Sequence, residues 1–185
     1  FPLIKENKMW LGATGNGSDM VFAVPEGTEV AEKDKQKAAR LGYVGDYTRL
    51  GNSCWFTTFD HGRRHQPIPL MSMEDNKKFN NRIQKNENSY KKYDNYDAIE
   101  IPYTNAIPSD YNGMMAVPIS FLDKYSPEQF EILGVTQRND DPYKIKQYTN
   151  NDYSNANDLN ARGVLIVAGK PRAMYVRILV RHKGK

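Results

Sequence analysis

Asn52-Ser53-Cys54-Trp55-Phe56-Thr57-Thr58-Phe59 is the densest β-strand candidate in the first half of the chain. Its aromatic and β-branched side chains are of the kinds enriched in strands. Two shorter apolar runs precede it: Met9-Trp10-Leu11, which ends at Gly12, and Met20-Val21-Phe22-Ala23-Val24, which ends at Pro25. Both apolar runs are predicted to be strands. They should be short, because glycine weakens a strand ladder and proline cannot donate to one.

A helix is predicted between these strands, over residues Glu29 to Leu41. The segment combines good helix formers with opposite charges three and four residues apart, and Gly42 follows it as a C-terminal cap. Its apolar residues are few. The helix is therefore expected to lie exposed on a surface.

The second half of the chain predicts further short strands between long polar loops. Residues 98–101 and 130–135 are strand candidates, whereas Pro118 interrupts the apolar run 114–122 and limits it to a bent or edge strand. The polar spans 74–97 and 138–160 offer few aliphatic side chains to bury. They are expected to be irregular, with one short helix around Asp75 to Arg82.

The chain is expected to close with a β-hairpin, in which residues 163–168 and 173–180 flank Gly169-Lys170-Pro171-Arg172. No internal repeat or clear linker divides the sequence. Together these elements predict a mixed α+β fold with mostly antiparallel strands, few short helices and long loops.

Composition limits the function classes without choosing one. The 185 residues include 26 Lys and Arg against 22 Asp and Glu, and a pI near 9.0 permits a polyanionic partner without requiring one. The single cysteine, Cys54, excludes an internal disulfide and a thiolate metal site built by this chain alone, and a buried structural thiol is favoured. No apolar run approaches the roughly 18 residues that a membrane-spanning helix needs. We expect a cytoplasmic protein and, because Phe1 is not an initiator methionine, a fragment of a longer one.

Three patterns associated with catalysis or ligand binding have simpler interpretations. Gly12-Ala13-Thr14-Gly15-Asn16-Gly17 has the composition of a cofactor loop, but a strand follows it where such a loop needs a helix, which favours a hairpin loop. His61 and His65 have the spacing of two zinc ligands, but Gly62 disfavours a helix and the intervening arginines would repel a cation. Glu6-Asn7-Lys8 has the acid-x-Lys spacing of a Mg²⁺ nuclease, but in a helical context with no upstream acid. No catalytic, cofactor-binding or metal-ligating residue is predicted in this chain.

Twelve tyrosines are present, and some of them interleave with lysines in Tyr90-Lys91-Lys92-Tyr93-Asp94-Asn95-Tyr96. Such interleaving occurs on surfaces that stack on nucleobases. Tyrosines also pack loops onto a core while their hydroxyls stay wet. The packing interpretation is favoured over base stacking here.

Six blocks, in order along the chain, resemble the EcoRI-type adenine-specific DNA methyltransferase family. The blocks are FPLIKENKMWLG (1–12), LGNSCWFTTFDH (50–61), YDNYDAI (93–99), DYNGMMAVPISFLDKY (110–125), PEQFEILG (127–134) and MYVRILVR (174–181). No single block is diagnostic. The resemblance is carried by the order of the series, which runs from one end of the chain to the other.

The resemblance implies an enzyme that transfers a methyl group from S-adenosylmethionine to the exocyclic amine of adenine in double-stranded DNA. The family's Asn/Asp-Pro-Pro-Phe/Tyr motif is absent, since the sequence contains no Pro-Pro, and the cofactor loop is absent too. We therefore expect the C-terminal portion of an α/β methyltransferase. Alone, it should neither bind the cofactor nor methylate DNA, because it lacks the N-terminal catalytic half of its own chain.

The same resemblance divides the chain into two regions. Residues 1–60 are expected to form the edge-strand hairpin of the methyltransferase sheet with a helical insertion, in which Met9–Leu11 pairs antiparallel with Cys54–Phe59. Residues 61–185 are expected to form the DNA-recognition region, ending in the β-hairpin. An enzyme that acts on a base inside a duplex must flip the base out and hold the distorted backbone. The candidate DNA contacts are Arg63, Arg64, Lys91, Lys92, Asn112 and Gly113.

Two other functions remain open after the methyltransferase. The first is a nucleic-acid-binding module without catalysis, which predicts salt-sensitive DNA binding by this chain alone. The second is a Mg²⁺-dependent nuclease, which predicts DNA cleavage that disappears in Glu6→Ala.

Overall fold

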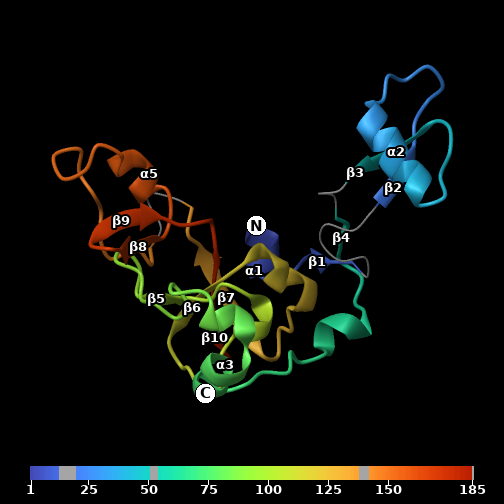
Figure 1. Cartoon of the computed structure of the whole chain (residues 1–185). Helices are drawn as coiled ribbons and strands as arrows, with labels where there is room; N and C mark the ends of the chain where they lie inside the picture. Colours follow the sequence, from blue (N-terminus) through green and yellow to red (C-terminus); the bar gives the residue numbers. More distant parts are fainter. Residues whose placement is uncertain (13–19, 51–53, 138–141, 185) are drawn as a thin grey trace. The chain divides into compact units, whose positions relative to one another are not determined.

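The computed structural model describes residues 1–12, 20–50, 54–137 and 142–184. They belong to two compact units (Figure 1): a smaller unit of Met9–Asp60, and a larger unit that combines Phe1–Lys8 with His61–Lys185. The chain thus divides after residue 60, but its first eight residues pack with the larger unit instead of the smaller one. None of the described helices is both long enough and apolar enough to cross a membrane.

The smaller unit contains two separate two-stranded ladders. β1 (Trp10–Leu11) pairs antiparallel with β4 (Phe56–Thr57), which confirms the predicted pairing of these two apolar runs. β2 (Met20–Ala23), also predicted, pairs antiparallel with β3 (Tyr47–Leu50). β3 was not predicted from the sequence, because Tyr47-Thr48-Arg49-Leu50 does not form an apolar run.

α2 (Glu32–Arg40) lies against β3, and Ala38 is its only buried residue. The predicted helix and its exposure are therefore confirmed. The strand predicted over residues 52–59 is shorter in its described part, and its aromatic rings are not buried: Trp55 and Phe56 keep 59% and 45% of their surface exposed. Cys54 is only partly buried, which corrects the expectation of a buried thiol.

A four-stranded sheet forms the centre of the larger unit. Its strands lie in the order β5 (Ala98–Glu100), β6 (Met114–Val117), β10 (Ile178–His182) and β7 (Phe130–Val135). β5 and β6 are parallel, whereas β10 is antiparallel to both of its neighbours, with an irregularity in its register to β7. The mixed and mostly antiparallel strands agree with the predicted α+β class.

Two strand predictions need correction. β6 is an interior strand and not a bent or edge strand, because the ladder ends before Pro118. The hairpin consists of β8 (Val164–Val167) and β9 (Lys170–Ala173), whereas β10 leaves it to join the sheet. Its turn is Ala168-Gly169, with φ of 50° and 75°, as a two-residue hairpin turn of type I′ requires.

Both faces of the four-stranded sheet are covered, so its strands are apolar without the alternation of a half-exposed sheet. On one face the strands pack against η3 (Ile119–Lys124), where the rings of Phe121 and Phe130 meet edge to face with centroids 5.3 Å apart. On the other face they pack against Tyr96 and, from β8, Leu165.

Six short helices complete the described elements: α1 (Pro2–Lys5), η1 (Gly62–His65), α3 (Met73–Phe79), α4 (Asn81–Gln84), η2 (Thr104–Ala106) and α5 (Ala156–Asn160). The span 74–97 therefore contains two helices where one was predicted, and the predicted loop over 138–160 contains α5. Asn80 explains the division between α3 and α4. It ends α3, and its Oδ1 accepts a hydrogen bond from the Arg82 backbone N–H at 3.1 Å, which caps α4.

Candidate nucleic-acid interface

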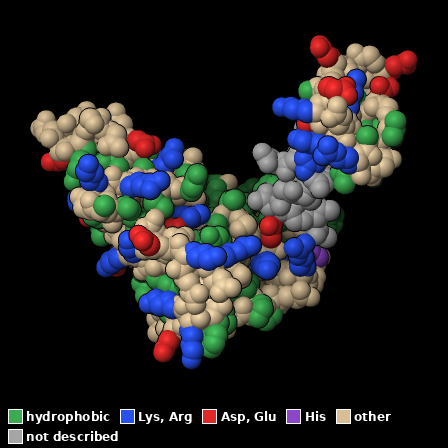
Figure 2. Space-filling view, in the orientation of Figure 1, with side chains coloured by type: hydrophobic (Ala, Val, Ile, Leu, Met, Phe, Trp, Pro, Cys, Tyr) green, Lys and Arg blue, Asp and Glu red, His purple; other side chains and the backbone are tan. Residues whose placement is uncertain are grey.

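The positive charge of the chain is concentrated in the larger unit. Residues 1–8 and 61–185 contain 21 Lys and Arg against 15 Asp and Glu, a net charge of +6, whereas residues 9–60 contain five against seven, a net charge of −2. Figure 2 shows lysine and arginine side chains spread over the visible face of the larger unit, with fewer acidic side chains among them. A cationic surface attracts a polyanion. A nucleic-acid contact is therefore expected on the larger unit.

Two polar hollows of the larger unit share the residues at the end of η3, Asp123 and Lys124. The first hollow has a volume of about 230 Å³ and the second about 350 Å³. We call them together the η3 trough. Besides the two shared residues, its polar lining consists of Arg63 and Gln66 in the first hollow and Arg82, Tyr103, Thr104, Asn105 and Ser120 in the second.

The chemistry of the η3 trough suits a phosphodiester backbone. Arg63, Arg82 and Lys124 supply three cations against one carboxylate, from Asp123. The Arg82 guanidinium lies 5.5 Å from the centroid of the Tyr103 ring, which holds it on an aromatic face. Guanidinium, ammonium, hydroxyl and amide groups are those that contact DNA phosphates.

The two arginines predicted to face DNA together are separated by the fold of η1. Arg63 is exposed and lines the trough. Arg64 keeps only 8% of its surface exposed, and its Nη2 donates a short hydrogen bond to the Asn7 side chain. Asn7 has a φ of 56°, in the left-handed region that asparagine tolerates at helix ends. Of the two candidate DNA contacts, only Arg63 is exposed, because Arg64 ties the first residues of the chain to η1.

Lys92 and Gly113 lie near one ring, that of Tyr111, which directly precedes Asn112 in the sequence. Burial raises the pKa of Tyr111, the charge of Asp97 adds to that effect, and the charge of Lys92 opposes it. The Lys92 ammonium lies 2.7 Å from an Asp97 carboxylate oxygen, and both side chains are exposed. Asn112 is also exposed. These residues form a second polar surface, which the trough's lining does not include, and their contact with DNA remains a prediction.

Gly113 already has a structural reason to be glycine. A Cβ at this position would lie 2.6 Å from the Tyr111 Oη, far inside van der Waals contact. The ring approaches the backbone closely only because no side chain intervenes. Packing therefore accounts for this residue without any contact to DNA.

Two of the three tyrosines that interleave with lysines are buried, as the packing interpretation predicts. Tyr93 and Tyr96 are buried with edge-to-face rings, and Tyr90 donates a hydrogen bond to the Ala106 carbonyl oxygen at 2.8 Å. Lys91, between them, is exposed, and its carbonyl oxygen accepts from the Glu100 N–H at 2.8 Å. The segment is hydrogen-bonded to β5 through its backbone, and its lysines are exposed.

A buried ionic cluster lies next to this segment and was not predicted from the sequence. Glu100 keeps 1% of its surface and accepts hydrogen bonds from the Arg177 guanidinium, from Nε at 3.1 Å and more closely from Nη2. The Tyr93 hydroxyl donates to the same carboxylate. Burial raises the pKa of Tyr93 far above its ordinary value and the carboxylate adds to this, while Arg177 opposes it. A glutamate inside an apolar strand was the only signal for this cluster in the sequence.

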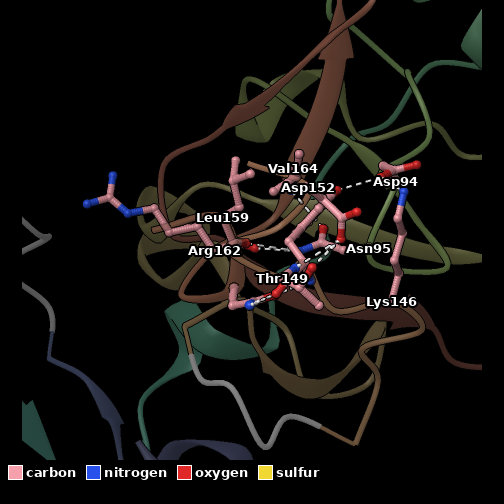
Figure 3. A network of polar contacts seen from close by, with 10 residues as sticks. Asp94, Asn95, Lys146, Thr149, Asp152, Leu159, Arg162 and Val164 are labelled. Atoms are coloured by element: carbon pink, nitrogen blue, oxygen red, sulfur yellow. Dashed lines mark hydrogen bonds and ion pairs between the residues drawn. The ribbon is translucent and has the colours of Figure 1, made fainter. Parts of the chain in front are cut away.

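A second polar network holds the segment after residue 142 against residues 94 and 95 (Figure 3). The Asn95 amide donates to the Arg162 carbonyl oxygen at 2.7 Å and accepts from the Val164 N–H at 2.8 Å. Burial acts to raise the pKa of Asp94, but hydrogen bonds from Lys146, at 2.6 Å, and from Tyr148 outweigh it, so the pKa lies below its ordinary value. These contacts join segments about 50 to 70 residues apart in the sequence, which gives the network a structural role.

The patterns associated with catalysis do not assemble a catalytic centre in the described residues. Glu6 and Lys8 form an exposed ion pair at 2.6 Å in the turn after α1, whereas a nuclease needs its acid-x-Lys pair on a strand. His65 Nδ1 lies 2.7 Å from a Glu128 carboxylate oxygen. Over the same residues, no group of three or more His, Cys, Asp and Glu side chains is placed to hold a metal ion.

Comparison with known proteins gives a consistent result along the chain. Residues 1–183 match the family described as adenine-specific methyltransferase EcoRI. The type II methyltransferase M.EcoRI of Escherichia coli is 45% identical over 134 residues, which are 72% of this chain and 37% of that protein. M.MpnI of Mycoplasma pneumoniae is 30% identical over 192 residues, 99% of this chain and 52% of its own. M.MgeORF184P of Mycoplasma genitalium is 31% identical over 183 residues, which are 98% of this chain and 51% of that protein. The chain spans about half the length of these relatives or less, and no solved structure matches it significantly.

Proposed function

Because this chain belongs to the EcoRI family of adenine-specific methyltransferases, we propose that it is the C-terminal, DNA-facing part of an S-adenosylmethionine-dependent DNA adenine methyltransferase of a restriction-modification system. In this proposal the remainder of the protein supplies the Pro-Pro motif and the cofactor loop. The sequence contains no Pro-Pro, and the matched relatives are longer than the chain. The part described here binds the duplex and positions it.

We expect the remainder of the protein, and not this part, to hold S-adenosylmethionine. A mostly apolar hollow of about 760 Å³ lies beside Phe1, with Tyr175 and Arg177 in its lining. None of its lining residues is an aspartate or glutamate. A nucleoside site uses such a carboxylate to hold the ribose hydroxyls.

The η3 trough is the observation that carries the DNA-facing assignment. An enzyme that modifies a base in a duplex must rotate that base out of the stack and stabilise the distorted backbone. Cations and hydroxyls outside the catalytic pocket provide this stabilisation through phosphate contacts. Arg63 lines the first hollow, Arg82 the second and Lys124 both, and these three cations on the positively charged unit support that role.

Expression of the complete protein in cells that lack adenine methylation tests the proposal. We expect N6-methyladenine at one short sequence in the host DNA, mapped by sequencing that reads modified bases. The purified protein is expected to transfer labelled methyl groups from S-adenosylmethionine to a duplex with that sequence, and the 185-residue chain alone is expected to transfer none. A complete protein that leaves adenine unmodified in both assays contradicts the proposal.

A nucleic-acid-binding module without catalysis is the second candidate, favoured by the net charge of +6 on the larger unit. The same experiment separates the two functions. DNA binding with a steep salt dependence, but without methyl transfer by the complete protein, supports the binding module.

A further inference from the structure

Phe79, the last residue of α3, is exposed at the corner between α3 and α4. Its side chain keeps 62% of its surface open, whereas the same helix buries the polar Asn76 completely. Single exposed apolar residues are common on protein surfaces. The surroundings of this ring therefore decide what it does.

The surroundings of Phe79 are cationic. Lys77 and Lys78 precede it in the last turn of α3, and the Lys78 ammonium lies 5.1 Å from the centroid of its ring. Arg82 follows three residues later and lines the η3 trough. The acidic residues of α3 are confined to its first turn, at the opposite end of the helix. An exposed ring with an ammonium group beside it, on a cationic stretch of the chain, fits a partner that is both aromatic and negatively charged.

The corner that presents the ring is held by its own hydrogen bonds. Asn80 closes α3 through its N–H to the Asn76 carbonyl oxygen at 3.0 Å and caps α4 with its side chain. Gln84 Nε2 donates to the Lys78 carbonyl oxygen at 2.6 Å, across the corner. A ring on a backbone fixed in this way loses little conformational entropy when a partner stacks on it.

We propose that Phe79 stacks on a nucleobase of DNA whose phosphate backbone lies in the η3 trough. The inference rests on the proposed function, because it takes duplex DNA as the partner. Aromatic rings stack on any base through its π face, and apolar side chains insert between base steps where a protein unstacks them. Arg82 connects the two contacts, since it belongs to the trough and to the corner that carries Phe79.

Phe79→Ala in the complete protein tests the proposal, with Phe79→Trp as the conservative variant. Tyr175→Ala, at a ring that keeps 76% of its surface exposed and lies outside the trough, is the matched control. The probe is a series of short DNA duplexes of mixed sequence with 2-aminopurine at successive positions, since this base fluoresces more strongly when it is unstacked. Where the enzyme methylates a site, duplexes with that site are added.

We expect Phe79→Ala to weaken binding by roughly 5- to 150-fold, the range of one base–aromatic stack. The rise in 2-aminopurine fluorescence that the unmodified protein causes by unstacking the base should also be lost in this variant. Phe79→Trp is expected to retain both, and Tyr175→Ala to change neither. The slope of log Kd against log salt should stay unchanged in Phe79→Ala, because stacking releases no counterions. Circular dichroism of each variant checks that it is folded, which we expect for an exposed position.

Two outcomes overturn the stacking contact: binding by Phe79→Ala within about twofold of the unmodified protein, or binding by Phe79→Trp no better than by Phe79→Ala. The proposed function can fail separately. If the complete protein methylates DNA and Phe79→Ala binds DNA as tightly as the unmodified protein, only the stacking contact is overturned. Loss of binding in Phe79→Ala, in a protein that binds DNA but never methylates it, overturns only the methyltransferase assignment.

Discussion

Glu100 and Arg177 form a buried ion pair within the larger unit. The carboxylate lies in β5 and accepts from the guanidinium Nε at 3.1 Å to each of its oxygens. Arg177 directly precedes β10 and retains 12% of its side-chain surface. The pair joins the edge strand β5 to the connection that brings β10 back into the sheet.

Glu100→Gln is expected to destabilise the larger unit by about 3–5 kcal/mol, because it leaves the guanidinium buried without its counter-charge. The measurement is urea unfolding of the complete protein, followed by hydrogen exchange of the β5 and β10 amides. Glu131→Gln is the control, since Glu131 pairs with Arg181 at 3.0 Å where both side chains are exposed. That pair should contribute about 1 kcal/mol or less. Equal losses in the two variants would show that burial does not govern the effect.

Acid is expected to loosen the segment that Asp94 holds. The pKa of Asp94 is lower in the folded chain than its ordinary value of 3.8, because of the hydrogen bonds from Lys146 and Tyr148. A depressed folded pKa means that these contacts stabilise the fold above that ordinary value and are lost as the pH falls through the folded pKa. The window therefore lies below about pH 4.

Hydrogen exchange of residues 142–160, measured at pH 5 and at pH 3, checks this prediction. The unmodified protein is expected to lose protection at the lower pH. Asp94→Asn should be less protected at pH 5 and show a smaller change between the two values. Asp152, whose pKa is also lowered, lies in the same segment, so only the difference between the two proteins reports on Asp94. Parallel pH profiles for both would rule out Asp94 as the source.

Two glycines with similar crowding should respond differently to alanine. A Cβ at Gly163 would lie 2.5 Å from Cε1 of Tyr93, whose ring is buried and held by Glu100. A Cβ at Gly113 would meet the Oη of Tyr111, at the far end of a side chain that is only partly buried. Gly163→Ala is expected to cost about 1–3 kcal/mol as an overpacked core, and Gly113→Ala clearly less. Thermal unfolding of both variants measures this, and the reverse order would contradict the argument.

The elements predicted correctly are those whose signal is local. The charge spacing of residues 29–41 predicts α2, and the apolar runs at 98–101 and 130–135 predict β5 and β7. The pairing of β1 with β4 needed more than a local pattern, because the two strands are separated by a helix and a second ladder. It was predicted from the family resemblance.

The features that sequence reasoning missed depend on partners far along the chain. Glu100 and Arg177 are 77 residues apart, and neither position alone indicates a buried charge. The residues of β10 were predicted to be one strand of a hairpin. Nothing in those residues shows that they pair with β6 on one side and β7 on the other. Arg63 and Arg64 are equivalent in sequence. The contact with Asn7, 57 residues away, is what turns only the second one inward.

The salt dependence of DNA binding should separate Arg64, which is buried, from Arg63 and Lys124, which line the η3 trough. Each cation that neutralises a phosphate contributes about 0.9 to the slope of log Kd against log salt. Lys124 lines both hollows, so Lys124→Ala in the complete protein is expected to lower the slope by about that amount and to weaken binding equally on unrelated duplexes. Arg63→Ala should have the same effect as Lys124→Ala.

Arg64→Ala should keep the slope and lower the unfolding temperature instead, because the Arg64 guanidinium is buried against Asn7. Lys170→Ala, at an exposed position in β9, is the charge-matched control. Fluorescence anisotropy over a series of salt concentrations gives the slopes, and a Lys124→Ala slope equal to that of the control would place the DNA backbone somewhere other than the trough.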